Sequence, residues 1–528
     1  MTAPRPRRRL GGALAVGLGI FLSRIAGLVR ERVLAHYLGR SDEAGAFRAA
    51  LRIPNFLQNL LGEGVLSAAF IPVYTRLRAE GRDAEAQAMA RVVGTLLAVV
   101  AAAVTVLGVV AAGPLTELIA PGFTGTTRDL TVRLVQITFP GVALLVLSAW
   151  CLGVQNSHRK FFLSYVSPVV WNAVVIGFAI ALGRRLLGQP GDLAEWIAWG
   201  TVAGSAAQLA VQLPTVWRLL GGLRPSLAMG APGVGASLRA FGPVVIGRGS
   251  VQLSSYLDQI LASYLGSAIV AGMSAAQVLA TLPVSLFGMA VSAAELPEMA
   301  RATGDPHAIA AAVRARLAPA MRRVVFLVAP SAVAFVALAG EIVGLVFQTG
   351  RFSAEDTQVV ALILAGSALG LLANTQGRLL ASAFYAMGDT KTPLRAALVR
   401  VAVAFVLGLI VALPLRDALG YSTTWGAFGL TAAAAAAAWI EYLLLRRALG
   451  HVLGGVPAPR ALTWGAVGAA VVAGALTWMV VTALGPTGVV TRAALALPLF
   501  GLAYLWPMLA FRVPEATSLV RRFTRRRG

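Results

Sequence analysis

Runs of about twenty mainly apolar residues recur along the whole sequence, and they constrain its fold more than any other feature. A helix needs about 20 such residues to cross the hydrocarbon core of a bilayer. We find fourteen candidate spans, near residues 12–38, 44–72, 90–113, 130–154, 161–183, 195–217, 240–265, 270–296, 323–347, 358–386, 394–415, 424–445, 461–483 and 490–511. Only 13% of the residues are charged, against about 25% in soluble proteins. The sequence therefore predicts an all-α polytopic membrane protein and excludes an ordinary soluble enzyme.

Arginine dominates the charged residues and gives the chain a net charge of +23. Such an excess is typical of nucleic-acid-binding proteins, but here the arginines are scattered between apolar runs, and only Lys160 and Lys391 are lysines. With a cytoplasmic N-terminus, basic residues in the cytoplasmic segments outnumber those outside by about four to one, as the positive-inside rule requires. We therefore predict a protein of the cell membrane with both termini in the cytoplasm, which binds no nucleic acid.

The sequence carries no pattern typical of a metal or cofactor site. Its four histidines are far apart and form no ligand cluster: His36, His158, His307 and His451. The single cysteine, Cys151, cannot form an intrachain disulfide. The glycine-rich segment GAPGVGAS (230–237) follows no strand and has no phosphate-loop lysine, so we interpret it as a linker. We predict no metal, no cofactor and no enzymatic activity.

Short motifs recur in the same order after about 225 residues: YLG at 37–39 and 264–266, and SAA at 67–69 and 292–294. Because this offset covers six spans, the two copies would insert in the same orientation, as in parallel-repeat transporters. Chance similarity among Ala- and Leu-rich helices is the alternative. The predicted segments are a first six-helix lobe (1–218), a cytoplasmic linker (219–239), a pseudo-symmetric second six-helix lobe (240–447) and spans 13–14 with a basic cytoplasmic tail (448–528). Two such lobes around a central cavity are typical of carriers that alternate their access.

Charged and polar residues inside the predicted spans are the main functional signal, because intramembrane charges are costly and usually face a cavity or a partner. The residues that we predict to bind the substrate lie in spans 1 and 2: Arg24, Arg30, Glu31, Arg52, Asn55, Asn59 and Glu63. Further cavity candidates are Arg48 in span 2, Arg248 and Asp258 in span 7, and Arg378 in span 10. For Arg48, extension of the side chain to the outer interface is an equal alternative. For the other three, a structural role stays open.

A cavity lined mainly by arginine suits an anionic substrate. Guanidinium groups bind phosphate oxygens in a bidentate manner and keep their charge in a partly dry site. The carboxylates would hold the arginine side chains in place when the cavity is empty. Within span 2, Pro54 lacks the N–H that the helix needs, so we expect a kink there.

At these residues the sequence resembles the MurJ/MviN family of the MOP exporter superfamily. The matching segments include SRIAGLVRERVLAHYLG (23–39), FRAALRIPNFLQNLLGEGVLSAAFIPVYTR (47–76), GVQNSHRKFFLSYVSPVVWN (153–172) and ASAFYAMGDTKTP (381–393). The resemblance implies a flippase that moves lipid II, the undecaprenyl-pyrophosphate-linked peptidoglycan precursor, from the inner to the outer leaflet for cell-wall synthesis. It also implies a V-shaped pair of lobes, a groove for the lipid tail at spans 13 and 14, and lipid II, membrane lipids and optionally cell-wall synthesis proteins as partners.

The resemblance carries over to single residues in the first two spans. Arg24 matches the family's Ser-Arg, Arg30-Glu31 matches its Arg-Asp pair, Arg52 matches the basic residue before Pro-Asn, and Glu63 matches the acid of Glu-Gly. Two segments depart from the pattern: Gln58-Asn59 replaces basic residues, and AAQVLATLP (275–283) lacks the charges expected in span 8. These departures leave two alternatives open: an exporter of another polyprenyl-linked glycan or a drug, and a transport-inactive scaffold for cell-wall synthesis.

Overall fold

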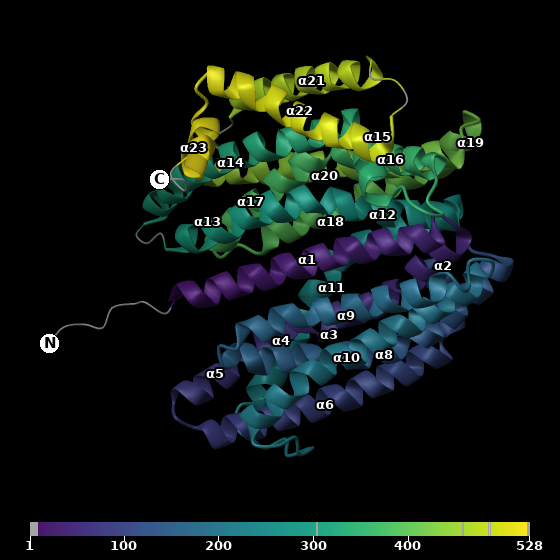
Figure 1. The fold of residues 1–528 in the computed structure, drawn as a ribbon. Coiled ribbons are helices and arrows are strands. Elements are labelled where there is room, and N and C mark those ends of the chain that lie inside the picture. The colour runs from purple at the N-terminus through teal and green to yellow at the C-terminus, as the bar shows by residue number, and fades with distance from the viewer. Residues whose placement is uncertain (1–8, 302–304, 457–458, 484, 486, 525–528) are drawn as a thin grey trace. The chain divides into compact units, whose positions relative to one another are not determined.

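A computed structural model describes the chain from residue 9 to residue 524, except residues 302–304, 457–458, 484 and 486. The described residues form helices joined by turns and contain no strand (Figure 1). Contacts within the chain divide it into two compact units, residues 1–271 and 272–528. The prediction of an all-helical protein is confirmed.

The first unit consists of eleven helices and the beginning of a twelfth. They are α1 (Arg9–Leu38), α2 (Asp42–Ala50), α3 (Arg52–Leu61), α4 (Glu63–Ala69), α5 (Ile71–Ala79), α6 (Asp83–Val110), α7 (Ala112–Ile119), α8 (Gly125–Ser157), α9 (Phe161–Gly183), α10 (Pro190–Leu220), α11 (Val234–Leu265) and the start of α12 (Ser267–Pro283). Helix α8 packs against α6, α9 and α10. Its buried Trp150 joins Phe70 and Tyr74 in the apolar core of this unit.

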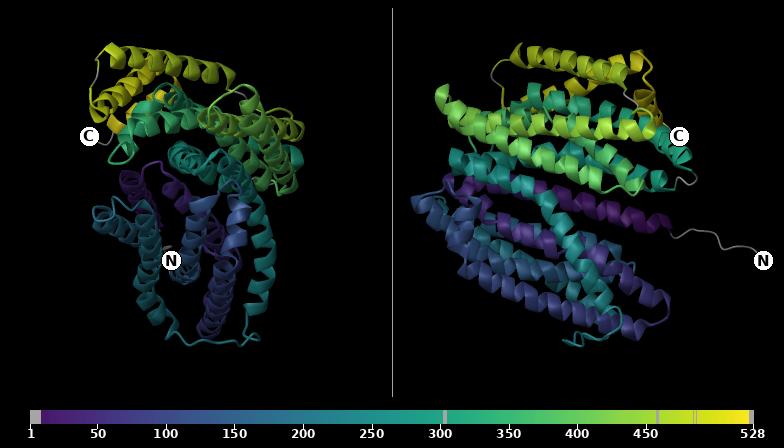
Figure 2. Two further views of the ribbon diagram at one scale, coloured as in Figure 1. Left: turned by 90° about the vertical axis from the view of Figure 1, so that its right-hand side faces the viewer. Right: turned by 180° about the vertical axis from the view of Figure 1, so that it is seen from behind.

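The second unit continues α12 through the π-helical segment η1 (Val284–Met289) into α13. Its further elements are α13 (Ala290–Ala300), α14 (Pro306–Ala337), α15 (Ala339–Phe347), α16 (Ala354–Ala368), α17 (Leu371–Ala386), α18 (Lys391–Ile410), the π-helical η2 (Val411–Leu415), α19 (Arg416–Ala418), α20 (Thr423–Leu453), α21 (Arg460–Ala483), α22 (Val489–Ala510) and α23 (Pro514–Thr524). Helices α18 and α20 pack against each other, and α17 packs against both α14 and α20. Helices α21 and α22 run side by side, as Figure 2 shows from two further directions.

The number of spans is lower when it is judged by length and apolar composition together. Ten helices in the described part of the chain are long and apolar enough to cross a membrane, or eleven if the bent pair α16 and α17 counts as one span. Helices α1, α10 and α11 have 30, 31 and 32 residues but do not pass this test. The protein is therefore a multi-pass membrane protein, and the predicted count of fourteen is not confirmed.

The ninth predicted span has the wrong bounds. We expected a helix over 323–347, but α14 covers Pro306–Ala337, and the short α15 follows after a break at Leu338. The apolar run continues through this break, so hydropathy alone could not locate it. Arg314, Arg316 and Arg322, which precede the predicted span, are part of α14.

The boundary between the two units also differs from the predicted boundary between the lobes. We expected residues 240–447 to form the second lobe, but α11 and the first residues of α12 belong to the first unit. The reason is that α11 packs along α3, α4 and α7. The pseudo-symmetric repeat itself stays a prediction.

Candidate substrate-binding site

The second predicted span is broken into short helices, and this break separates its two arginines. Residues 42–79 run as one apolar segment of 38 residues, but α2 ends at Ala50 and α3 begins at Arg52. Pro54 cannot donate a hydrogen bond to the carbonyl of Ala50, which weakens the helix at the point where we expected a kink. A second break lies at Gly62, where a Cβ atom would approach the Gln58 carbonyl oxygen to 2.2 Å. Arg48 thus lies in the last turn of α2, and Arg52 begins α3.

Glu31 is the centre of a cluster of charges in the first unit. Its side chain is only 4% exposed and accepts hydrogen bonds from two guanidinium groups. Arg30 Nη2 lies 2.5 Å from Glu31 Oε1, and Arg48 Nη2 contacts Oε2. A buried carboxylate needs such partners, because an unpaired charge is strongly disfavoured away from water. The ion pair directs the Arg48 side chain toward Glu31, and its role in a cavity stays a prediction.

Arg30 is held from a third direction by α9. Its Nη1 donates to Asn172 Oδ1 at 3.1 Å, and its Cζ lies 4.7 Å from the centre of the Trp171 ring. Asn172 Nδ2 in turn donates to the carbonyl of Pro168 at 2.8 Å. Pro168 lies inside α9 one turn before Asn172, so the asparagine is anchored to the backbone of its own helix. Sequence reasoning did not single out Trp171 or Asn172.

Arg52 is positioned by contacts with Tyr256 on α11. The Tyr256 hydroxyl donates to the Arg52 main-chain carbonyl at 2.8 Å, and Arg52 Cζ lies 5.7 Å from the centre of the Tyr256 ring. Phe56 on α3 packs edge-on against the same ring at 4.9 Å. Asp258 lies within electrostatic reach of the Arg52 guanidinium. Tyr256 carries no charge, so the sequence analysis, which selected mainly charged residues within the spans, did not identify it.

The structure places the remaining predicted residues as follows. Arg24 is exposed on α1, and none of the residues that the structure describes is recorded as its ion-pair or hydrogen-bond partner. Asn55 and Asn59 are the two exposed residues of α3, and they lie three and seven positions after Arg52 on one face of the helix. The side chains of Glu63 at the start of α4 and of Arg248 in α11 lie outside the described part of the structure.

The structure therefore forms two groups from the predicted residues of the first unit. One consists of Arg30, Glu31 and Arg48, and the other of Arg52 with Asp258. Arg378 belongs to the second unit, where it is exposed on α17. Among the described residues, no three His, Cys, Asp or Glu side chains gather where they could hold a metal ion. The chemistry available in the first group and around Arg52 is therefore the binding of an anion by guanidinium groups.

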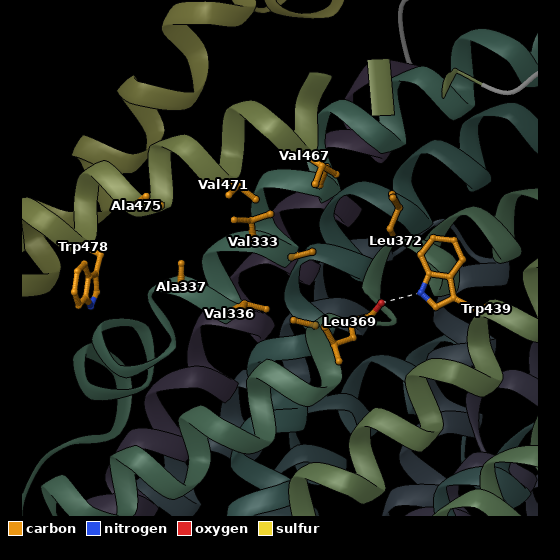
Figure 3. Close-up of a pocket in the computed structure, with 14 residues that line it drawn as sticks. Val333, Val336, Ala337, Leu369, Leu372, Trp439, Val467, Val471, Ala475 and Trp478 are labelled. Atoms are coloured by element: carbon orange, nitrogen blue, oxygen red, sulfur yellow. Dashed lines mark hydrogen bonds between the residues drawn. The ribbon is translucent and has the colours of Figure 1, made fainter. Parts of the chain in front are cut away.

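An apolar cavity of about 570 Å³ lies within the second unit. It is lined by α14, α17, α20 and α21, with Trp439 and Trp478 among its larger side chains (Figure 3). Trp439 Nε1 donates to the Leu369 carbonyl at 2.9 Å, so its indole is held at the wall. The remaining walls are made largely of Ala, Val and Leu, including Val333, Leu372 and Val471. Such a cavity can take an alkyl chain but offers little to a charged group.

Comparison with known proteins places this chain in a family. A family model described as "Lipid II flippase MurJ" matches residues 34–497. The chain belongs to the MurJ family of lipid II flippases. The matched region includes Arg48, Arg52, Asn55, Asn59 and Glu63, and it begins after Arg24, Arg30 and Glu31.

Curated relatives agree with this membership. "Lipid II flippase MurJ" of Burkholderia cenocepacia is 33% identical over 387 residues, which cover 71% of this chain and 73% of the relative. "Probable lipid II flippase MurJ" of Vibrio cholerae is 30% identical over 468 residues, which cover 87% of this chain and 86% of the relative. The resemblance of the sequence to the MurJ family is thus confirmed.

Solved structures show the same fold at low sequence identity. A structure titled "Lipid II flippase MurJ, inward closed conformation" aligns with a TM-score of 0.75 and 20% identity, covering 94% of this chain and 99% of that one. An inward-facing multidrug resistance MATE family transporter of the MOP superfamily aligns with a TM-score of 0.66 and 14% identity, covering 84% and 98%. The fold is therefore shared by the MurJ family and by drug transporters of the MOP superfamily, and it does not by itself select a substrate.

Proposed function

We propose that this protein is a lipid II flippase, which moves the lipid-linked peptidoglycan precursor from the inner to the outer leaflet of the cell membrane by alternating access. The observation that carries the proposal is the group of arginines in the first unit, held by one buried carboxylate, in a chain that belongs to the MurJ family. Transport of this kind moves a substrate without changing its bonds. The protein then acts as a transporter and not as an enzyme.

The charge balance of the first unit supports an anionic headgroup. Arg30 and Arg48 share Glu31, and Asp258 lies within electrostatic reach of Arg52, so these three arginines outnumber the two acids beside them. We assign the contact with the pyrophosphate to Arg24 and Arg52, together with Arg30 and Arg48, whose guanidinium groups Glu31 holds in place. Asn55 and Asn59 share the accessible face of α3 with Arg52 and would donate hydrogen bonds to the same group. Glu63, Arg248 and Asp258 would line the site beside them.

The apolar cavity in the second unit supports a lipid-linked substrate. Its walls offer alkyl and indole surface from α14, α17, α20 and α21 and thus suit an isoprenoid chain. We propose that the tail of the substrate lies there while the headgroup is bound. A carrier of soluble anions would have no use for such a cavity.

The distribution of arginine supports a single orientation. We propose that both termini lie in the cytoplasm, since this arrangement puts most basic residues on the cytoplasmic side. The substrate would then enter from the cytoplasmic leaflet. The driving force would be an ion gradient, the membrane potential or the flow of substrate.

Complementation tests the proposal. The resident lipid II flippase of a bacterial host is depleted while this chain is expressed, and growth is followed. We expect rescue by the unchanged chain, loss of rescue with Arg24→Ala and with Arg52→Ala, and normal rescue with Arg447→Ala, an exposed arginine of α20. Full activity of the Arg24→Ala/Arg52→Ala double variant would refute the assignment of these residues.

A failed rescue is followed by a direct measurement. The purified chain is placed in liposomes, and the fraction of labelled lipid II in the outer leaflet is compared with that of a labelled polyprenyl-pyrophosphate carrying another glycan. Movement of the second lipid alone would favour the alternative exporter. Movement of neither lipid would favour a transport-inactive scaffold.

A further inference from the structure

A second group of charges lies inside the membrane-spanning helices of the second unit. Arg400 on α18 donates from Nη1 to Glu441 Oε2 on α20 at 3.0 Å. Arg378 on α17 lies within electrostatic reach of both residues. Two guanidinium groups thus lie near one carboxylate, which pairs with Arg400 alone, and the group has one positive charge in excess. The groups around Glu31 and around Glu441 have the same composition, although they lie in different units.

The three charges lie at similar depths along their helices. Arg378 lies two turns before the end of α17, and Arg400 lies between two and three turns after the start of α18. Glu441 lies between three and four turns before the end of α20. Because α17 and α18 are joined by a short turn and α20 packs against α18, all three intervals run from the same end of these helices. The three charges therefore lie between two and four turns from the helix ends that they share.

Helix α17 exposes only one narrow stripe, and this stripe is polar. Apart from its last residue, Ala386, the accessible residues of α17 are Asn374, Arg378, Ala381 and Tyr385. They follow each other at spacings of four, three and four residues, which places them on one face of the helix. A helix surface that faces lipid would be apolar, whereas a polar stripe inside a span faces water or a polar ligand. Tyr385, which is half exposed, also lies within electrostatic reach of Glu441.

We propose that Arg378 and Arg400, together with Tyr385, form a second oxyanion site in this protein. The site would take a phosphate or carboxylate group of the transported headgroup. Glu441 positions Arg400 by accepting one of the five N–H donors of the guanidinium group, and the other donors remain for a ligand. Arg378 supplies a second planar fork, and the Tyr385 hydroxyl supplies a further donor. Among the described residues, no carboxylate forms an ion pair with Arg378. Its exposed guanidinium group can therefore bind an anionic ligand.

The assignment of this anion to the transported substrate rests on the proposed function, whereas the oxyanion site rests on the geometry alone. The headgroup of an anionic phospholipid carries the same phosphate chemistry and would reach the site from the surrounding bilayer. The two sources predict different ligands for the same residues, and an experiment can separate them. This experiment must report ligand binding at each arginine separately, because the first unit contains its own group of arginines.

Arginine labelling gives that readout. The full chain is placed in phosphatidylcholine nanodiscs and treated with phenylglyoxal, and modification of each arginine is followed by peptide mass spectrometry. We expect inorganic pyrophosphate to slow the labelling of Arg378 about threefold or more, since a bidentate ligand covers the reactive nitrogens. Lipid II added to the same nanodiscs should protect Arg378 as well. Nanodiscs of phosphatidylglycerol without lipid II should not, and Arg447 should react equally in all samples.

A binding measurement with variants completes the test. We expect Arg378→Gln to weaken one class of pyrophosphate sites about tenfold, the usual effect of losing a charged hydrogen bond. Arg378→Lys should lie between Arg378→Gln and the unchanged chain, because it keeps the charge and loses the fork. The matched variant Arg447→Gln should bind as the unchanged chain does. Unchanged binding by Arg378→Gln, with no protection of Arg378 by pyrophosphate, would overturn the oxyanion site.

The same labelling separates this inference from the proposed function. Protection of Arg24 by lipid II without protection of Arg378 would overturn the assignment of the second site to the substrate and leave the proposed function standing. Protection of Arg378 by pyrophosphate, with no effect of lipid II on either residue, would support the oxyanion site and contradict the proposed function. Protection of Arg378 by phosphatidylglycerol alone would overturn the assignment to the substrate in favour of a phospholipid headgroup.

Discussion

The Tyr256 hydroxyl donates a 2.8 Å hydrogen bond to the main-chain carbonyl of Arg52, a residue 204 positions earlier. This bond joins α11 to the first turn of α3, directly after the break in the second span. The Tyr256 ring also lies next to the Arg52 guanidinium and contacts Phe56. One uncharged side chain thus positions both the backbone and the side chain of an arginine that we assign to the headgroup.

Tyr256→Phe separates the two roles of this residue. The ring and its contacts remain, but the Arg52 carbonyl loses a donor, so we expect a loss of about 1 kcal/mol in the free energy of unfolding. Tyr256→Ala removes the ring as well and should cost about 3 kcal/mol or more. Thermal unfolding of the purified variants in detergent measures both. Equal stability of Tyr256→Phe and the unchanged protein would show that the hydrogen bond contributes nothing to the folded state.

Glu31→Gln tests the group of charges in the first unit. The substitution leaves Arg30 and Arg48 close together without their shared carboxylate, so we expect a destabilisation of about 3–5 kcal/mol. Arg24→Gln is the matched control, because Arg24 is exposed and has no recorded ion pair within the described chain. It should change stability by less than about 0.5 kcal/mol. The double variant Glu31→Gln/Arg48→Gln should recover part of the loss, since the repulsion is then relieved.

Charges inside apolar runs could be found from the sequence, whereas their partners could not. Arg30, Glu31 and Arg52 interrupt apolar segments and are visible in any count of intramembrane charge. Asn172 lies 142 residues from Arg30, and its contact depends on the packing of α1 against α9. Arg400 and Glu441 were not predicted either. Arg400 follows Lys391 and Arg395 in α18 and is typical of the basic end of a helix, whereas Glu441 is a single acid after the alanine run of α20.

The bounds of the helices could be predicted where turn residues coincide with the end of an apolar run. Helix α9 covers Phe161–Gly183, as expected from its sequence. The break at Leu338 could not be predicted, because it is made by backbone geometry within an unbroken apolar run. The place of α11 in the first unit depends on its packing against α3 and α4, which no periodicity in the sequence reveals.

Gly45→Ala tests a close contact between α2 and the start of α12. A Cβ atom at Gly45 would lie 2.1 Å from the carbonyl oxygen of Ser267, and the Ser267 hydroxyl donates to Asp42 in the same contact. Since the obstacle is backbone, the helices must move apart, and we expect a loss of about 1–3 kcal/mol. Gly27→Ala is the matched control, because its Cβ would meet nothing within 4 Å. Thermal unfolding should rank Gly45→Ala well below Gly27→Ala.

The stability of the protein should fall in mild acid through His158. This residue follows α8, outside the spans on either side, and its Nε2 lies 2.9 Å from the Tyr74 hydroxyl. Burial lowers the pKa of His158 below its ordinary value of 6.5, and the nearby Arg78 lowers the pKa further. The unfolded chain therefore binds a proton near the ordinary pKa that the folded chain does not yet bind, so stability is lost as the pH falls below that value.

Thermal unfolding of the unchanged chain and of His158→Gln between about pH 8 and pH 5 measures this effect. We expect His158→Gln to lose less stability over this range than the unchanged chain. His307→Gln, at an exposed position at the start of α14, is the control and should follow the unchanged chain. Parallel curves for all three proteins would contradict the role of His158.

Ala475→Trp tests whether the apolar cavity of the second unit holds the substrate's tail. Ala475 lines the cavity from α21, and an indole at this position would fill part of its 570 Å³. For lipid II with a full-length isoprenoid chain, we expect several-fold slower flipping. Each methylene group that is kept out of the cavity loses about 0.8 kcal/mol of favourable burial free energy. Lipid II with a short isoprenoid chain should be affected much less, since it needs less of the cavity. Val472→Trp is the control, because Val472 is exposed on the same helix and is not part of the cavity wall. Equal slowing of both lipids would place the defect in the fold of α21 and not in the binding of the tail.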